Sequence, residues 1–113
     1  MKEDEEKLPL GSVVRLQEGS HEFMIVQRLV LLPFDNETRL IDYGGCMFPE
    51  GVIGGNLVYF NHEDIDQVQF VGCKTKKEYM YDDLMKEYAA NHGIKHITRD
   101  EICEMKNREK VIK

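Results

Sequence analysis

Two neighbouring stretches decide the fold: DYGGCMFPEG (Asp42–Gly51) and NLVYFNHEDIDQVQF (Asn56–Phe70). Glycine and proline interrupt the first stretch, and these are the residues that tight turns and bulges require. The second stretch holds two short apolar runs separated by a polar cluster that begins at Asn61. Asn61 can cap a single helical turn over His62 to Asp66, because its side-chain oxygen accepts a hydrogen bond from a free backbone N–H. The two stretches therefore predict short strands with a one-turn helix before the last of them.

Short apolar runs bounded by turn residues continue towards the N-terminus. Pro33 is expected to end the second strand or to move it to an edge, and Gly44-Gly45 to supply a sharp bend or a bulge. Short antiparallel strands with one helical turn before the last are typical of a small, strongly bent barrel of the Src-homology-3 type, and an open antiparallel sheet is the alternative. The predicted strands cover residues 12–17, 22–32, 39–43, 56–60 and 68–72.

Helix-forming residues dominate the chain beyond Gly72. Thr75 is placed to cap a helix that runs to about His92, where Gly93 stops it. A second, weaker helix is expected after Thr98. The fold class is therefore α+β: a small antiparallel β-barrel or sheet followed by two C-terminal helices.

Three regions follow from these patterns. Residues 1–7 are almost entirely charged and cannot bury enough apolar surface to offset the entropy of ordering, so a disordered acidic tail is expected. Residues 8–72 form the β domain, and residues 73–113 form a C-terminal helical extension.

Charge and hydropathy narrow the function classes. The formal net charge of the 113 residues is −6, which repels phosphate backbones and argues against a nucleic-acid partner. No apolar run approaches the roughly 20 residues of a membrane-spanning helix, and the acidic start does not resemble a signal peptide. A cytoplasmic protein without membrane insertion is expected.

Candidate chemical groups are few and poorly spaced. The cluster from His62 to Asp66 can bind a metal or move protons, but consecutive residues on one turn diverge, so capping is the better interpretation. His92 and His96 are separated by Gly93, which breaks the helix that would align them. The three cysteines contain no CxxC pair, and the glycines lack the spacing of a phosphate-binding loop. The sequence predicts no catalytic residue, metal or cofactor, and hence a protein that is not an enzyme.

A stripe of apolar residues on the first helix has two interpretations. Tyr81, Leu84, Met85 and Tyr88 recur at helical spacing. They either pack on the β domain and close its core, or form a partner-binding surface, since Tyr and Met are enriched at interfaces. The candidate partner-binding residues of the chain are Tyr59, Phe60, Tyr81, Met85 and Tyr88.

Four ordered blocks carry a family resemblance: LPLGSVVRL (Leu8–Leu16), FMIVQR (Phe23–Arg28), DYGGCMFPEG (Asp42–Gly51) and YFNHEDIDQVQFVG (Tyr59–Gly72). Together they resemble the family called domain of unknown function 4176, which is found in Gram-positive bacteria with type VII secretion systems. The resemblance spans about Leu8 to Gly72 and does not extend beyond it. It implies a genomic setting beside LXG toxins and a cytoplasmic accessory role, and it carries over no catalytic residue.

The first functional hypothesis is a non-enzymatic chaperone or targeting adaptor that binds an LXG effector and assists its secretion, with other small accessory proteins or a second copy as further partners. The alternative is an immunity protein that masks a toxin domain, which the acidic composition suits because nuclease toxins present basic clefts. A third hypothesis, a small hydrolase or metal enzyme, requires the His62 cluster to converge with distant ligands.

Overall fold

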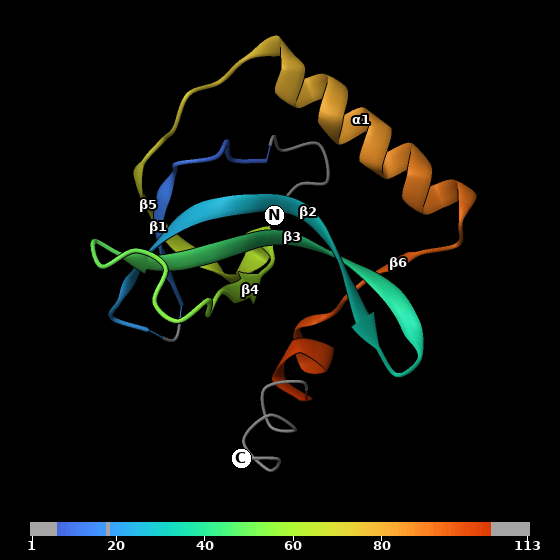
Figure 1. Ribbon diagram of the computed structural model, residues 1–113, viewed down its shortest axis with the longest axis horizontal. Coiled ribbons are helices and arrows are strands. Elements are labelled where there is room, and N and C mark those ends of the chain that lie inside the picture. Colours follow the sequence, from blue (N-terminus) through green and yellow to red (C-terminus); the bar gives the residue numbers. More distant parts are fainter. Residues whose placement is uncertain (1–6, 18, 105–113) are drawn as a thin grey trace.

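The computed structural model describes residues 7–17 and 19–104 of the chain. A second helical segment begins at Arg99 and is described as far as Glu104. The chain is therefore α+β with two C-terminal helices, as predicted (Figure 1). Except for Lys7, the predicted acidic tail lies outside the described residues. The named elements are β1 (Val13–Leu16), β2 (Glu22–Phe34), β3 (Glu37–Phe48), β4 (Val58–Phe60), the 3₁₀ turn η1 (His62–Asp64), β5 (Ile65–Phe70), α1 (Lys76–Asn91) and β6 (Lys95–His96).

The strands form one open sheet in the order β4-β3-β2-β1-β5. Neighbours along this path are antiparallel, whereas the short β6 pairs parallel to β3. The predicted closed barrel is wrong and the open-sheet alternative is correct, because β4 and β5 end the order without pairing with each other in the described part of the chain. Closure needs long, staggered terminal strands, and β4 has only three residues.

The β2–β3 hairpin is the longest pairing in the sheet. Its turn is made by Asp35 and Asn36, whose φ angles of 50° and 65° suit the two-residue turns that match strand twist. Pro33 does not end β2, which continues to Phe34, and the predicted alternative is observed: in the described part of the chain, β2 at Pro33 has β3 as its strand partner on one edge and no strand on the other. Pro33 pairs with Thr38 close to the hairpin end, where a missing N–H is tolerated.

The two glycines of β3 allow close approach of neighbouring strands. The register between β2 and β3 shifts between Ile25 and Gln27, opposite Gly45 and Gly44, so the predicted bulge is confirmed on the partner strand. A Cβ on Gly45 would lie 3.1 Å from the Met24 carbonyl oxygen of β2, which is tighter than most real Cβ contacts. The third strand therefore does not end at Tyr43 but runs through both glycines to Phe48.

Core residues lie on both faces of the sheet. One cluster contains Val14, Ile25, Tyr43 and Phe60. Two further clusters involve the C-terminal extension: Ala89 of α1 packs with Leu29 and Leu40, whereas Ile97 and Ile102 pack with Leu32, Phe34 and Ile41. Leu40 and Ile41 are consecutive in β3, so their side chains point to opposite faces. Helix α1 and the second helical segment therefore cover opposite faces, as Figure 1 shows.

Candidate functional site

Helix α1 begins and ends where the sequence predicts. Thr75 is the N-cap residue, although its side chain makes no capping hydrogen bond, and Gly93, at a φ of 64°, follows the last turn. Among the sixteen described residues of α1, the buried one is Ala89. Met85 and Ile94 pack partly buried against the same cluster. Apolar burial thus holds mainly the C-terminal half of the helix.

Two polar contacts hold the middle of α1. The buried guanidinium of Arg28 lies 2.8 Å from Asp82 Oδ1, and its Nε donates to the Leu8 carbonyl oxygen at 2.8 Å. The Tyr81 hydroxyl donates to the Arg28 carbonyl oxygen at 3.0 Å. A buried ion pair of this kind fixes position, because separating its partners leaves an uncompensated charge.

The outer face of α1 is apolar and exposed to solvent. Met80 is 70 % exposed and Leu84 is 63 % exposed. Tyr81 and Tyr88 are also exposed, and Met80, Leu84 and Tyr88 are spaced along one side of the helix. We call Met80, Leu84 and Tyr88 the outer face of α1, and Tyr81 lies at its border. Large exposed apolar patches mark interaction sites.

The structure separates the five residues that the sequence suggested for partner binding. Phe60 is 1 % exposed in the core, so it offers no surface to a partner. Tyr59 is partly buried against the cluster around Ile97, and Met85 is partly buried under α1. Tyr81 and Tyr88 are exposed, and Tyr88 stacks on His92 with the ring centroids 4.0 Å apart. The candidate surface therefore keeps Tyr81 and Tyr88.

The sequence analysis misplaced Leu84 and did not identify Met80 as a surface candidate. Leu84 was expected on the same face as Met85, but the structure exposes Leu84 and partly buries Met85. Met80 precedes Leu84 by four residues, which places both on one face of a helix. That spacing was a signal in the sequence, although it could not say which face is buried.

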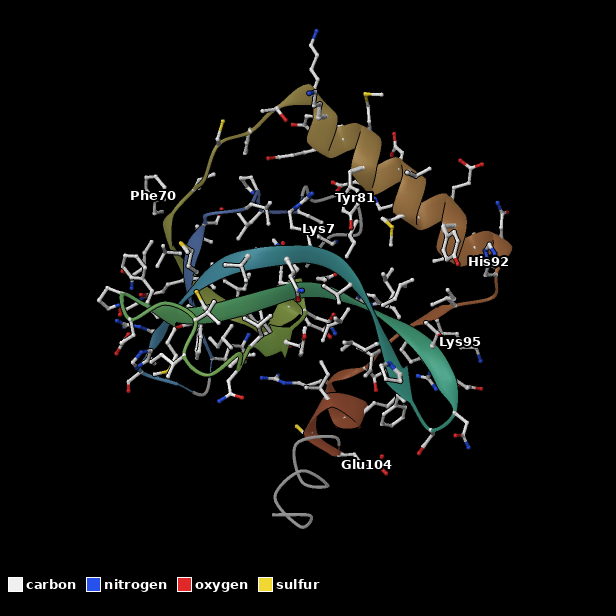
Figure 2. All side chains as sticks on the ribbon, in the orientation of Figure 1. Lys7, Phe70, Tyr81, His92, Lys95 and Glu104 are labelled. Atoms are coloured by element: carbon white, nitrogen blue, oxygen red, sulfur yellow. The ribbon has the colours of Figure 1, made fainter. Side chains whose placement is uncertain are left out.

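A groove separates α1 from β2. It has a volume of about 670 Å³ and is lined largely by apolar side chains, among them Leu10, Leu29 and Met85. Figure 2 shows Tyr81 on the side of α1 that faces β2. Tyr81 therefore borders both the groove and the outer face.

A cluster of polar groups surrounds Asp42 of β3, where η1 and β6 contact this strand. The Asp42 Oδ1 atom is 2.8 Å from Nε2 of His96 in β6, and Oδ2 accepts the backbone N–H of His62 at 2.8 Å. Lys7 Nζ lies 4.0 Å from Oδ1. Burial acts to raise the pKa of Asp42, but the hydrogen bonds and the charges of His96 and Lys7 outweigh it, so the net pKa lies below its ordinary value. Asp42 is thus held as a carboxylate.

Tyr43, Asn61 and His62 extend this cluster. The buried Tyr43 hydroxyl accepts the Leu8 N–H at 2.9 Å and lies 2.7 Å from His62 Nδ1, and burial raises the pKa of Tyr43 well above its ordinary value. Asn61 is the N-cap of η1, as predicted, but the turn ends at Asp64 rather than Asp66, because β5 begins at Ile65. Its amide also bridges elements: Oδ1 accepts the Asp42 N–H and Nδ2 donates to the Ile97 carbonyl oxygen. We call Asp42, Tyr43, Asn61, His62 and His96 the polar junction.

The polar junction ties the N-terminal segment, β3, η1 and β6 together. Within residues 7–17 and 19–104, no group of three or more His, Cys, Asp or Glu side chains is arranged to hold a metal ion. The backbone N–H of His62 and the imidazole of His96 both contact the carboxylate of Asp42. The buried Asp42 therefore links η1 and β6 to β3. Cys46 is buried, whereas Cys73 and Cys103 are exposed.

A second apolar patch lies at the β5 edge of the sheet. Phe70 is 61 % exposed, and Val68 and Val71 are also exposed. β5 pairs with β1, and the register between them shifts twice. Such irregularities hinder pairing with a further strand.

The family model for the domain of unknown function DUF4176 matches residues 7–81. This is more than half of the chain, and the chain belongs to that family. The match extends past Gly72 and into α1 as far as Tyr81, so the resemblance does not stop at the β domain as the sequence analysis expected. No curated protein and no solved structure matches the chain. Within the described residues, no helix has the length and apolar character needed to cross a membrane.

Proposed function

We propose that the chain is a non-enzymatic cytoplasmic adaptor that binds an LXG effector protein and assists its type VII secretion. Membership of the DUF4176 family supports this proposal, because the resemblance described above implies a setting beside LXG toxins. Other small accessory proteins or a second copy of the chain are further partners within the same proposal.

The observation that carries the proposal is the outer face of α1. Met80 and Leu84 expose most of their side chains to water, and aromatic residues flank them. Met and aromatic residues are enriched at protein interfaces, where they supply adaptable apolar contact. An adaptor needs a surface of this kind, whereas the polar junction is occupied by contacts within the chain.

The direct experiment is affinity purification of the tagged chain from its native host, followed by mass spectrometry of the proteins that co-elute. The Met80→Glu/Leu84→Glu variant is expected to recover about tenfold less effector, because each substitution places a carboxylate in an apolar contact. Ile53→Glu is the matched control, since Ile53 is an aliphatic residue that is also 56 % exposed but lies in the loop before β4. Equal recovery of effector by the folded double variant and the control would refute this surface assignment.

The alternative is an immunity protein that binds and inhibits a toxin domain. The net charge of −6 favours it, because complementary charge speeds association with a basic cleft. Truncation of the effector separates the two functions. An adaptor binds the N-terminal LXG region, and an immunity protein binds the C-terminal toxin domain.

A further inference from the structure

The groove under α1 is walled on one side by an open strand edge. β1 pairs with β2 only over Glu22 to Met24. The Ile25 N–H bonds to the Ser12 carbonyl and the Gly11 N–H to the Ile25 carbonyl, which continues the ladder by one residue. Beyond that point, β2 has β3 as its strand partner on one edge, and the described part of the chain places no strand on the other.

The N-terminal segment leaves this edge for a local reason. Gly11 has a φ of 87°, a conformation that glycine adopts without strain, and the Ser12 N–H closes a turn on the Pro9 carbonyl. Pro9 itself has no N–H to donate to a ladder. The turn from Pro9 to Ser12 therefore ends the β1 side of the pairing and leaves the following part of β2 uncovered.

Residues Val26 to Leu31 of β2 line the groove that results. The Arg28 carbonyl points into it, since it accepts the hydroxyl of Tyr81 from the opposite wall at 3.0 Å. In an antiparallel strand, N–H and C=O groups face each edge in alternation, so an open edge offers backbone donors and acceptors to an incoming strand. Two irregularities interrupt this alternation in β2: the register shift between Ile25 and Gln27, and the φ of 51° at Leu29. Strand pairing along the groove is therefore limited to the short stretches on either side of Leu29. The wall of this groove is thus a hydrogen-bonding strand edge as well as an apolar surface.

Helix α1 forms the opposite wall. Tyr81 and Met85 line it, and Thr75, Lys77 and Glu78 stand where the helix begins. Because Ala89 is the buried residue of the helix, the N-terminal half of α1 is not seated on the sheet by a buried side chain. The volume of about 670 Å³ lies within the range of pockets that bind ligands.

We infer that this groove binds an extended, apolar segment of a partner protein, which adds as a strand to the open edge of β2 beneath α1. A strand edge favours an extended peptide over a helix, because main-chain hydrogen bonds supply affinity and side-chain pockets supply specificity. The segment would place apolar residues on either side of the irregularity at Leu29. The net charge of −6 disfavours a second copy of the chain, because like charges repel.

This inference does not rest on the adaptor proposal. The adaptor proposal concerns Met80 and Leu84 on the outer face of α1, whereas the groove lies on its inner side. Substitutions on one side therefore serve as controls for the other, and either proposal can fail alone.

The test is selection of a phage-displayed library of random peptides of about ten residues against the purified full-length chain. Selected peptides are expected to show alternating apolar residues, and N-methylation of alternate amides should weaken their binding about tenfold, because it removes strand hydrogen bonds. Met85→Glu should weaken binding by a similar factor, and Met80→Glu should leave it unchanged. Leu10→Glu is a second groove variant that the fold tolerates more readily, since Leu10 is 53 % exposed.

Five results would overturn the inference. Selection can yield no sequence, or sequences with helical rather than alternating periodicity. Selected peptides can keep their affinity after N-methylation, which would make the groove an apolar pocket without strand pairing. Binding that neither Leu10→Glu nor Met85→Glu weakens would place the site elsewhere, for example at β5. A dimer in sedimentation that the peptide dissociates would assign the groove to a second copy.

Discussion

The polar junction and helix α1 are attached to the same sheet by contrasting means. At the junction, Asp42 and its neighbours bond to the N-terminal segment, η1 and β6, above a core that includes Ile25 and Phe60. Helix α1 is held by Ala89 at one end and by the Arg28–Asp82 ion pair in the middle. One region satisfies its polar groups internally, and the other leaves its largest apolar side chains in water.

This contrast indicates which region is available to a partner. Regions with few buried apolar contacts open at lower free energy than the core, and binding surfaces are drawn from them. The sheet needs no partner to bury its clusters, whereas Met80 and Leu84 can be buried only by another surface. The contrast therefore supports the core of the sheet as the scaffold, and α1 together with the groove beneath it as the proposed recognition surface.

The largest expected effect is on the core beneath the junction. Phe60→Ala should lower the free energy of unfolding by about 3–5 kcal/mol, because it removes a fully buried ring and leaves a cavity. Urea denaturation followed by far-ultraviolet circular dichroism measures the change. A loss of less than about 1 kcal/mol would show that this core is not the source of stability.

Separating the ion pair under α1 should have the next largest effect. Arg28→Ala leaves the Asp82 carboxylate without its guanidinium partner and is expected to cost about 3 kcal/mol. The Arg28→Met/Asp82→Leu variant is the control, since it removes both charges and should recover part of the loss. If the single and double variants unfold at the same urea concentration, the pair does not position α1.

Acid should weaken the polar junction. The pKa of Asp42 is lower in the folded protein than its ordinary value of about 4. The Asp42 carboxylate therefore stabilises the fold above about pH 4, and this stabilisation is lost as the pH falls below that value. Urea unfolding measured from pH 7 to about pH 3 should show this decline, and Asp42→Asn should reduce its steepness. A variant with the same pH dependence as the parent chain would contradict the assignment.

The smallest expected effect is on the outer face of α1. Leu84→Ala should change the free energy of unfolding by no more than about 0.5 kcal/mol, because the side chain is already exposed and alanine favours helix. Thermal unfolding measures this. A loss comparable to that of Phe60→Ala would mean that Leu84 is buried in solution, and it would remove the contrast between the two regions.

Local signals in the sequence predicted much of the fold. The turn at Asp35 and Asn36, the cap at Asn61 and the end of α1 before Gly93 all follow from residues with specific backbone preferences. The helical start after Thr98 is also confirmed, and the Glu101 carboxylate accepts the Thr98 N–H there as in a capping box. Each of these features depends on neighbours within a few residues.

Features that depend on distant contacts could not be predicted. Residues 95–96 pair with β3 because His96 meets Asp42, and two residues carry no strand periodicity of their own. Closure of the barrel depends on the length of β4. The sequence predicted this strand over residues 56–60, whereas it covers only Val58–Phe60. The candidate site shows the same limit. Apolar residues occur on both sides of α1, so spacing identified the helix but could not decide whether Leu84 or Met85 is buried.

Hydrogen–deuterium exchange of the free chain and of its complex with the effector's N-terminal region tests whether α1 is the recognition element. The amides of α1 should exchange faster than those of β2 and β3 in the free chain, and the complex should slow exchange in α1 while leaving the β2–β3 ladder unchanged. The contradicting result would be an α1 as protected as the sheet before binding, or an α1 whose exchange the complex does not alter.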